Sequence, residues 1–385
     1  MKLETDLLTK EQSVAIAEII NWFKVDSMIK KFWRLKGKAG TGKTSLIKVL
    51  LTESTFIQKN QKVAVIAPTH AAARVLRSKG VPAQTIHSLI YRVEELPDGT
   101  MVYHRKSKDE IKYEYSLLVV DEASMCDSFM RNDILAFEIP VLFVGDAGQL
   151  PPVSGTSDDK KGLFMQEAES SLNEIHRNAG PIANLADLIR NGQMPRKGKF
   201  GEGVFVMEEE DLTSNLLLSS DQLIVGKNTT RSYYNKYLRK LKGIDYRNLP
   251  AINEKVIVLQ NSYDQGIFNG TILESMEDNN TTLIRKTSAN LNIKFSYINE
   301  FNVNTEVKFK PYFPCIEDLE GEKVHIKINN LIKVDFAYAI TCHKAQGSSF
   351  EKPIVISEKM GDREFMKKWN YTAITRAESK IIICL

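Results

Sequence analysis

A chain of 385 residues is too long for one ordinary hydrophobic core, so we expect two or three domains. Its 43% hydrophobic and 26% charged residues are those of a soluble globular protein, no apolar run approaches the ~20 residues of a membrane span, and we expect no signal peptide at its start. Four scattered cysteines without a C-x-x-C pair favour a reducing compartment, the cytoplasm, over a structural zinc site, and the net charge of +4 permits nucleic acid as a partner without requiring it.

The first strong motif along the chain is GKAGTGKT at residues 37–44, which satisfies the P-loop pattern G-x-x-x-x-G-K-[ST]. The run 32–35 predicts a strand entering the loop, and 45–51 predicts a helix leaving it. Glycines let backbone N–H groups face phosphate oxygens, and the start of the helix adds its own free N–H groups. Lys43 can reach the β- and γ-phosphates, and the Thr44 hydroxyl can ligate Mg²⁺. We therefore expect a nucleoside triphosphate to bind here.

Near-continuous apolar runs follow, as is typical of buried parallel strands. One set lies at 62–67, 117–120 and 141–144, and a second lies at 222–225, 353–356 and 380–383. Helical patterns separate the runs, so the sequence predicts an α/β protein with two parallel-sheet domains.

Two segments interrupt this alternation. Residues 91–115 read as a hairpin with Pro97, Asp98 and Gly99 at its tip, inserted in the first domain. Residues 245–329 are β-like with many turns, with runs at 256–259, 270–273, 282–284 and 324–328, and predict a small barrel-like insert.

Acidic and amide side chains follow two strands of the first set. Asp121 and Glu122 end the run 117–120, where Asp121 would share a Mg²⁺ ion with Thr44 and Glu122 would act as a general base on the attacking water. Gln149 lies in the stretch GDAGQLPP after the run 141–144, where its amide could contact a γ-phosphate.

The order of these motifs resembles superfamily 1 helicases of the 5′→3′ branch, close to phage Dda and bacterial RecD-like enzymes. The segments that carry the resemblance are LTKEQ at 8–12, APTHAAA at 67–73, TIHSL at 85–89, DEASM at 121–125, GDAGQLPP at 145–152, LNEIHR at 172–177, TCHKAQGS at 341–348 and YTAITRA at 371–377. They cover nearly the whole chain.

The resemblance implies two RecA-like motor domains, an inserted pin hairpin and an SH3-like barrel. Residues 1–155 would form the first motor domain with the pin at 91–115, 156–244 with 330–385 the second, and 245–329 the barrel. ATP and Mg²⁺ are the implied cofactors. Arg177 and Arg376, both assigned to the second domain, would stabilise charge on the γ-phosphoryl group as fingers.

The implied site residues form four groups. The catalytic residues would be Lys43, Glu122, Gln149, Arg177 and Arg376. Gln12 would read the adenine, and the nucleotide would also contact Gly37, Ala39, Gly40, Thr41, Gly42, Lys43, Thr44 and Gly347. Thr44 and Asp121 would hold the metal. Single-stranded DNA would contact Pro68, Thr69, His70, Thr85, His87, Asn228, Thr229, Thr341, His343 and Ser348. Pro97, Met101 and Tyr103 of the hairpin would stack on the last base pair and separate the strands.

The segment 226–242 admits two interpretations. Six basic residues with no acid, and three interleaved tyrosines, fit a surface that tracks a strand. A helix with a solvated basic face and buried tyrosines fits equally well.

The sequence thus predicts an ATP-dependent 5′→3′ single-strand translocase and DNA helicase. An RNA helicase, or a remodeller of nucleoprotein that unwinds duplex weakly, is the alternative. Expected partners are single-stranded DNA and forked duplex, with a single-strand-binding protein or replication and recombination proteins as further candidates, and we expect a monomer.

Overall fold

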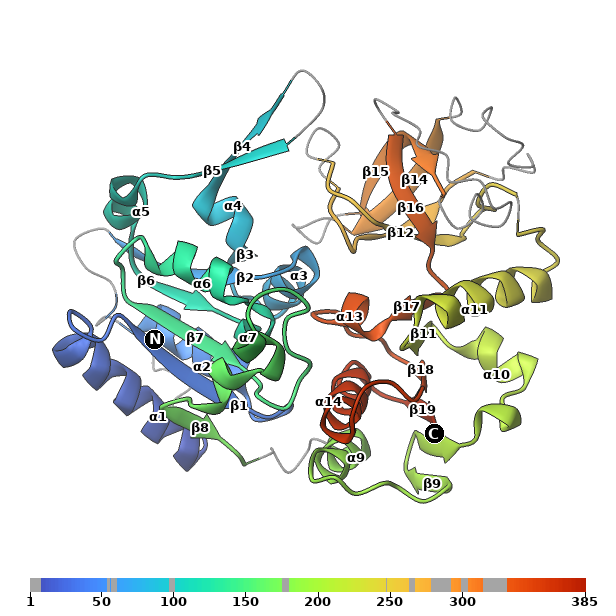
Figure 1. The fold of residues 1–385 in the computed structure, drawn as a ribbon, viewed down its shortest axis with the longest axis horizontal. Coiled ribbons are helices and arrows are strands. Elements are labelled where there is room, and N and C mark those ends of the chain that lie inside the picture. Colours follow the sequence, from blue (N-terminus) through green and yellow to red (C-terminus); the bar gives the residue numbers. More distant parts are fainter. Residues whose placement is uncertain are drawn as a thin grey trace. The chain divides into compact units, whose positions relative to one another are not determined.

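The computed structural model describes residues 8–53, 56, 61–96, 101–174, 180–246, 248–262, 267–277, 292–298, 304–313 and 331–385. The chain divides into two compact units, residues 1–192 with 367–375 and residues 193–366 with 376–385. Each unit contains a sheet covered by helices (Figure 1).

The first unit is built on a parallel sheet with the strand order β3-β2-β6-β7-β1-β8. Its strands are β1 (Phe32–Gly37), β2 (Lys62–Ala67), β3 (Ala83–Thr85), β6 (Tyr115–Val120), β7 (Val141–Gly145) and β8 (Ser170–Leu172). Its helices are α1 (Lys10–Asn21), η2 (Trp22–Asp26), α2 (Lys43–Thr52), α3 (His70–Ser78), α4 (Ile86–Ile90), α5 (Lys108–Glu114), η4 (Ala123–Met125), α6 (Ser128–Leu135), α7 (Ser157–Lys161), α8 (Leu163–Gln166) and α9 (Gly180–Arg190). The apolar runs predicted at 62–67, 117–120 and 141–144 are fully or largely buried strands.

The first unit extends beyond the predicted boundary at residue 155. Strand β8 pairs in parallel with β1, and α9 also belongs to this unit. A three-residue strand carries too short a pattern to be recognised in the sequence. Arg177 comes between β8 and α9 in the sequence, but residues 175–179 lie outside the described ranges, so its assignment to the second domain stays a prediction.

The predicted hairpin at 91–115 is shorter than expected. Strands β4 (Tyr91–Glu95) and β5 (Met101–Arg105) pair in antiparallel register, and the remainder is helix α5. Ser107 caps α5 and accepts from the N–H of Glu110, while the Glu110 carboxylate accepts from the N–H of Ser107. This reciprocal cap starts a helix where the sequence interpretation continued the hairpin.

The second unit contains a mixed sheet with the order β17-β11-β18-β19-β10-β9, in which only β9 is antiparallel among the described strands. Its strands are β9 (Gly198–Gly201), β10 (Val204–Met207), β11 (Gln222–Val225), β17 (Ala339–Thr341), β18 (Pro353–Ile356) and β19 (Ile381–Cys384). Its helices are η5 (Glu209–Asp211), α10 (Ser214–Ser219), α11 (Asn228–Leu241), α13 (Cys342–Ala345) and α14 (Arg363–Ile374), the last of which is divided between the two units.

A closed barrel is inserted between α11 and β17. It consists of β12 (Lys255–Val258), β13 (Ile272–Ser275), β14 (Ile293–Ile298), β15 (Asn304–Tyr312) and β16 (Leu331–Phe336) around a core that includes Val258, Phe295 and Phe309. The predicted insert is therefore confirmed, but it continues through β16 and past residue 329. The predicted strands at 282–284 and 324–328 lie outside the described residues.

Candidate active site

The P-loop joins β1 to α2 in the first unit, as the sequence predicted. Gly42 caps α2 with a φ of 76°, in the left-handed region that favours glycine. A Cβ on Gly37 would lie 2.8 Å from Thr41 Oγ1, so a side chain there would push against the loop. Gly40, with a φ of 78°, completes the turn. The loop conformation therefore depends on its glycines.

Lys43 is held inside this loop. Its ammonium group donates to the carbonyl oxygens of Gly37 and Lys38, each at 2.8 Å. Thr44 follows in the first turn of α2, whose N–H groups are available to an anion. Lys43 thus has the reach and the charge to exchange loop carbonyls for phosphate oxygens.

Gln12 connects α1 to the P-loop. It forms a reciprocal cap with Thr9, and its Nε2 donates to the carbonyl of Thr41 at 3.0 Å. Its side chain is buried. The structure therefore places Gln12 at the nucleotide loop, while its predicted contact with adenine stays a prediction.

Two adjacent carboxylates follow β6. Burial, followed by the neighbouring Glu122 carboxylate, raises the pKa of Asp121 to about 6, and Lys43 opposes both effects. Glu122 has a φ of 52°, an unfavourable backbone conformation for a residue with a side chain and one that is common at functional sites. A carboxylate destabilised by its surroundings, with a second carboxylate beside it, is suited to a cation.

The side chains of this site supply too few ligands to bind a divalent cation alone, so phosphate oxygens of the nucleotide would complete its coordination. Among the described residues, no group of three or more His, Cys, Asp or Glu side chains could hold a metal ion. Mg²⁺ is commonly bound by one or two carboxylates together with substrate phosphates. Asp121 and Thr44 are the side chains that would supply the protein ligands.

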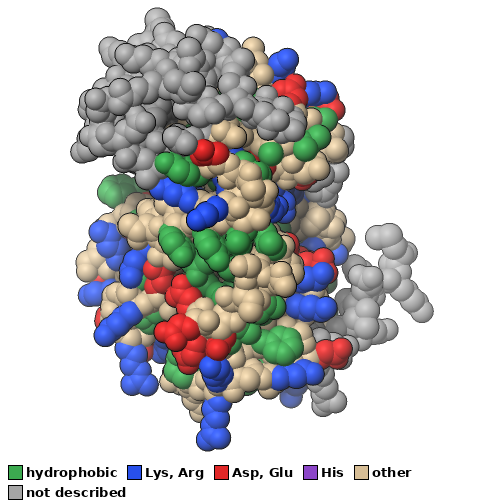
Figure 2. All heavy atoms as spheres, turned by 90° about the vertical axis from the view of Figure 1, so that its right-hand side faces the viewer, with side chains coloured by type: hydrophobic (Ala, Val, Ile, Leu, Met, Phe, Trp, Pro, Cys, Tyr) green, Lys and Arg blue, Asp and Glu red, His purple; other side chains and the backbone are tan. Residues whose placement is uncertain are grey.

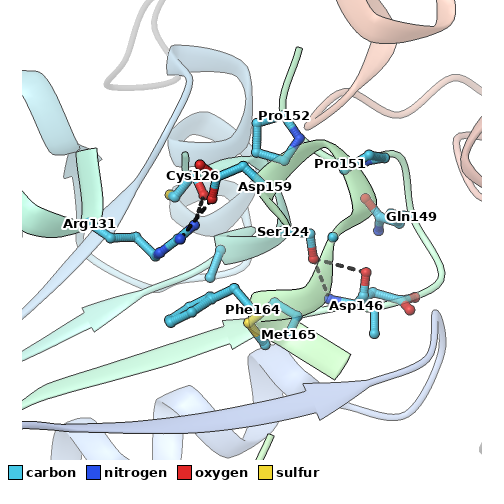
Figure 3. Close-up of a pocket in the computed structure, with 13 residues that line it drawn as sticks. Ser124, Cys126, Arg131, Asp146, Gln149, Pro151, Pro152, Asp159, Phe164 and Met165 are labelled. Carbon is cyan, nitrogen blue, oxygen red and sulfur yellow. Dashed lines mark hydrogen bonds and ion pairs between the residues drawn. The ribbon is translucent and has the colours of Figure 1, made fainter. Parts of the chain in front are cut away.

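Asp146, on the loop after β7, is the centre of a buried hydrogen-bond network. Its backbone N–H and carbonyl both pair with the Ser124 hydroxyl, as Figure 3 shows. Its carboxylate accepts from Arg190 Nη1 at 2.8 Å and from the Tyr371 hydroxyl at 2.5 Å. Tyr371 also accepts from the backbone N–H of Ala39 in the P-loop, at 2.9 Å. The network therefore connects the loop after β7 with the P-loop.

Arg190 and Tyr371 are site residues that the sequence interpretation did not single out. Arg190 is the last residue of α9, and Tyr371 lies in α14 within the segment 367–375 that packs with the first unit. A further ion pair joins Lys38 of the loop to Asp187 of α9 at 2.5 Å. Tyr371 belongs to the quoted stretch YTAITRA, which was a readable signal; Arg190 had none.

Gln149 lies on the same loop as Asp146 (Figure 3). Its side chain is buried, and its Oε1 has no hydrogen-bond partner. A buried amide oxygen without a donor is unfavourable, so an incoming N–H group or water molecule would stabilise it. This property suits a residue that contacts a ligand.

Arg376 follows α14 in the second unit. It is 6% exposed, and its Nη1 lies 3.5 Å from the carbonyl of Ser348. The N–H of Phe350 donates to its backbone carbonyl at 2.8 Å. Within the second unit, Arg376 is thus connected with the segment 341–348, where Gly347 has a φ of 77°.

The predicted DNA-contacting residues lie at the carboxyl ends of parallel strands. Pro68 and Thr69 follow β2, and Thr85 ends β3; in the second unit, Asn228 and Thr229 follow β11 and Thr341 ends β17, with His343 and Ser348 beyond it. Thr69 and Thr85 cap α3 and α4. Ligands of α/β sheets bind at this edge.

The three histidines of this set carry no charge at neutral pH. Burial, assisted by Arg77 and His87, lowers the pKa of His70 to about 4, and burial lowers the pKa of His87 and of His343. They can contact a strand as neutral imidazoles rather than as cations.

The base of the hairpin packs against His87. Tyr103 lies opposite Val93 in the register of β4 and β5, and its ring makes edge contacts with His87 and Tyr91. Tyr103 therefore lies midway along the paired strands of the hairpin, and its predicted contact with the last base pair stays a prediction. Pro97 and the side chain of Met101 lie outside the described part of the chain.

Helix α11 resolves the two interpretations of residues 226–242. Arg239 is fully buried in an ion pair with Glu254, and Arg231 pairs with Asp335 at 2.8 Å, so these bases stabilise the fold. Tyr233, Lys236, Tyr237 and Lys240 instead line an open groove with residues 243–246. Figure 2 views the side of the molecule on which α11 lies and shows apolar side chains at the surface, bordered by both basic and acidic ones. This groove, with exposed Asn228 and Thr229 at the start of the helix, is therefore a surface of α11 that a strand can reach.

The comparisons with known proteins agree with this geometry. Residues 8–209 match a family model described as an AAA domain, and residues 336–384 match the UvrD-like helicase C-terminal domain. The first match covers more than half of the chain, so the chain belongs to the AAA-domain family of P-loop proteins. The UvrD-like helicase match and the relatives agree with the predicted resemblance to the 5′→3′ branch of superfamily 1 helicases; the closeness to phage Dda stays a prediction.

Two curated relatives and one solved structure illustrate the similarity. An uncharacterized protein of Methanocaldococcus jannaschii is 25% identical over 91% of this chain and 36% of its own length. The ATP-dependent RecD2 DNA helicase of Deinococcus radiodurans is 25% identical over 90% of this chain and 46% of its own. The structure of Bacteroides Pif1 bound to ssDNA has a TM-score of 0.57 and 20% identity, covering 98% of this chain and 92% of that one. The chain spans less than half the length of the two curated relatives.

None of the helices in the described ranges is long and apolar enough to cross a bilayer.

Proposed function

We propose that this chain is an ATP-driven 5′→3′ translocase on single-stranded DNA that separates duplex strands. The observation that carries the proposal is the first-unit site, where the P-loop, two carboxylates and Gln149 follow β1, β6 and β7 of one parallel sheet. The similarity to the RecD2 helicase and to Pif1 bound to ssDNA supports DNA as the substrate.

Each residue then has a defined part in hydrolysis. Lys43 exchanges its loop carbonyls for phosphate oxygens, Glu122 accepts the proton of the attacking water, and Gln149 contacts the γ-phosphate. Mg²⁺ on Thr44 and Asp121 would neutralise phosphate charge when bound. Arg376 and Arg177 stabilise charge that develops on the transferred group.

Translocation requires that nucleotide binding and release change the contacts with the strand. The predicted strand residues occupy the carboxyl edges of both sheets, and the first sheet carries the P-loop at the same edge. Neutral histidines and capping threonines suit contacts with phosphate and sugar that carry no sequence information.

Duplexes with a single 5′ or a single 3′ tail test the proposal. Unwinding with ATP is expected from the 5′-tailed substrate, and unwinding only from the 3′-tailed substrate would refute the polarity. RNA-stimulated ATPase above the DNA-stimulated rate would favour an RNA helicase. Displacement of bound protein without strand separation would favour a remodeller of nucleoprotein.

The hairpin β4–β5 is proposed as the wedge. Its base is anchored through His87, and Arg92 pairs with Glu110 of α5, so force on the hairpin would be resisted by the first unit. Deletion of residues 95–101 is expected to spare DNA-stimulated ATPase and abolish unwinding. Equal loss of both activities would contradict a wedge.

We further propose forked duplex as the working substrate, a monomer as the active form, and contacts with a single-strand-binding protein or with replication and recombination proteins. The cytoplasm is the proposed location, because Cys126, Cys342 and Cys384 are buried free thiols.

A further inference from the structure

The hydroxyl of Tyr371 accepts a hydrogen bond from a backbone N–H group of the P-loop. Its oxygen accepts from the Ala39 N–H at 2.9 Å and lies 3.3 Å from Arg190 Nη1, while its proton is donated to Asp146 Oδ2 at 2.5 Å. The guanidinium carbon of Arg190 lies 5.3 Å from the centre of the tyrosine ring. Both the donor and the acceptor capacity of this hydroxyl are therefore used.

Burial, followed by the Asp146 carboxylate, raises the pKa of Tyr371 far above its ordinary range, so the hydroxyl keeps its proton and remains a donor to Asp146. Tyr371 is 2% exposed and Asp146 is fully buried, so neither group has water to replace a lost partner. The arrangement therefore keeps the phenol oxygen within hydrogen-bonding distance of the Ala39 N–H.

The N–H groups of a P-loop are the groups that cradle phosphate. A phenol oxygen and a phosphate oxygen cannot accept from the Ala39 N–H along the same direction at the same time. We propose that the Tyr371 hydroxyl competes with a nucleotide phosphate for the Ala39 N–H, so that nucleotide binding releases Tyr371 and thereby repositions α14. This inference rests on the proposed function and adds a positioning residue to it.

The place of Tyr371 in the chain gives this competition a consequence. Residues 367–375 pack with the first unit, and Arg376 is the first residue that returns to the second. Arg376 comes five positions after Tyr371, so release of the phenol moves the segment from which Arg376 extends. Tyr371 acts through Arg376 and takes no part in the chemical step.

Substitution Tyr371→Phe tests the competition, because it removes the hydroxyl and keeps the ring beside Arg190. In fluorescence titrations without DNA, the variant is expected to bind a non-hydrolysable ATP analogue about 2- to 10-fold more tightly, the range of one net hydrogen bond. In steady-state assays with single-stranded DNA, KM for ATP is expected to fall together with kcat.

Tyr234→Phe is the matched control. Tyr234 is also a buried tyrosine, and it donates to a carboxylate, that of Glu209, at 2.6 Å in the second unit. Its loss is expected to cost similar stability, measured as Tm, and to leave affinity for the analogue unchanged.

Unchanged or weaker binding of the analogue by Tyr371→Phe would overturn the competition, and tighter binding with unchanged kcat would overturn the coupling to Arg376. The titration contains no DNA, so it is independent of the strand activity. A wild-type protein that binds nucleotide but unwinds neither tailed duplex would refute the proposed function alone.

Discussion

Two buried polar clusters, one in each unit, differ in how completely their groups are paired. In the second unit, Arg239 donates to Glu254 at 2.6 Å and to the carbonyls of Tyr246 and Leu249, and its guanidinium lies 3.8 Å from the centre of the Phe336 ring. All of these partners are provided by the protein, and the cluster fastens α11 to the barrel.

The nucleotide site of the first unit is less complete. Gln149 Oε1 lacks a donor, burial and the neighbouring Glu122 raise the pKa of Asp121, and Glu122 has an unfavourable φ. Buried polar groups are normally paired, so the unpaired Gln149 Oε1, on the same sheet edge as Asp121 and Glu122, indicates where a ligand completes the structure. The comparison separates charges that stabilise the fold from charges that serve the reaction.

The largest expected effect is on hydrolysis. Glu122→Gln keeps the shape of the side chain and removes the base, so kcat for DNA-stimulated ATPase is expected to fall by about 10²- to 10⁴-fold. Nucleotide affinity should remain within a few-fold of wild type. Release of inorganic phosphate and a titration with the ATP analogue measure the two quantities.

Glu138→Gln is a control with matched chemistry and backbone. Glu138 also has a left-handed φ, 53°, but it pairs with Lys108. Its substitution should leave kcat unchanged. Full ATPase activity in the Glu122→Gln enzyme would remove Glu122 from the base role and weaken the distinction between the clusters.

The second prediction concerns stability. Arg239→Leu leaves Glu254 buried without its partner, so the free energy of unfolding is expected to fall by about 3–5 kcal/mol. Denaturant unfolding measures it, and Lys240→Ala, on the exposed side of the same helix, should change it little.

A different result would reverse the assignment of Arg239. If Arg239→Leu kept its stability and lost DNA-stimulated ATPase, the basic run 226–242 would be a strand-binding surface throughout. The double substitution Arg239→Leu with Glu254→Leu should recover part of the stability, because it removes both charges.

Features of the fold and of the site could be predicted from the sequence where the residues that form them are close together along the chain. Buried strands such as 62–67 and 141–144 appear as continuous apolar runs, and the P-loop is a local pattern that its own glycines enforce. Helix α5 was also readable, since Ser107 and Glu110 form a capping pair, but the hairpin interpretation obscured it. Local signals therefore placed most of the first sheet and its loops.

The remaining features depend on contacts between distant residues. Tyr371 meets Asp146 across 225 positions, and Arg190 meets Tyr371 across 181. Whether a basic residue such as Arg239 is buried or solvated depends on Glu254 and the barrel, which periodicity along α11 does not show. Tertiary partners, rather than residue type, decide which polar groups belong to a site.

The smallest expected effect is on the pH dependence of stability. The pKa of Asp121 is raised in the folded protein to about 6, so between its unfolded value near 3.8 and 6 the folded state binds more protons and wild-type stability falls as pH rises. Asp121→Asn lacks this titration. Its Tm without nucleotide should match wild type near pH 4.5 and exceed it by a few degrees at pH 7 and above.

Asp159→Asn provides the opposite sign within the same unit. Burial alone would raise the pKa of Asp159, but hydrogen bonds from Ser128, Thr156 and Arg131 reverse this and lower it well below the usual range. Its charged form therefore stabilises the fold above pH 4, and the substitution should lower Tm at neutral pH.

Mg²⁺ with the ATP analogue should raise the Tm of wild type more than that of Asp121→Asn, because the Asp121 carboxylate can bind the cation and the asparagine amide binds it poorly. An Asp121→Asn variant less stable than wild type at pH 7 would mean that Asp121 is compensated by the protein itself, like Asp159, and is not waiting for a ligand.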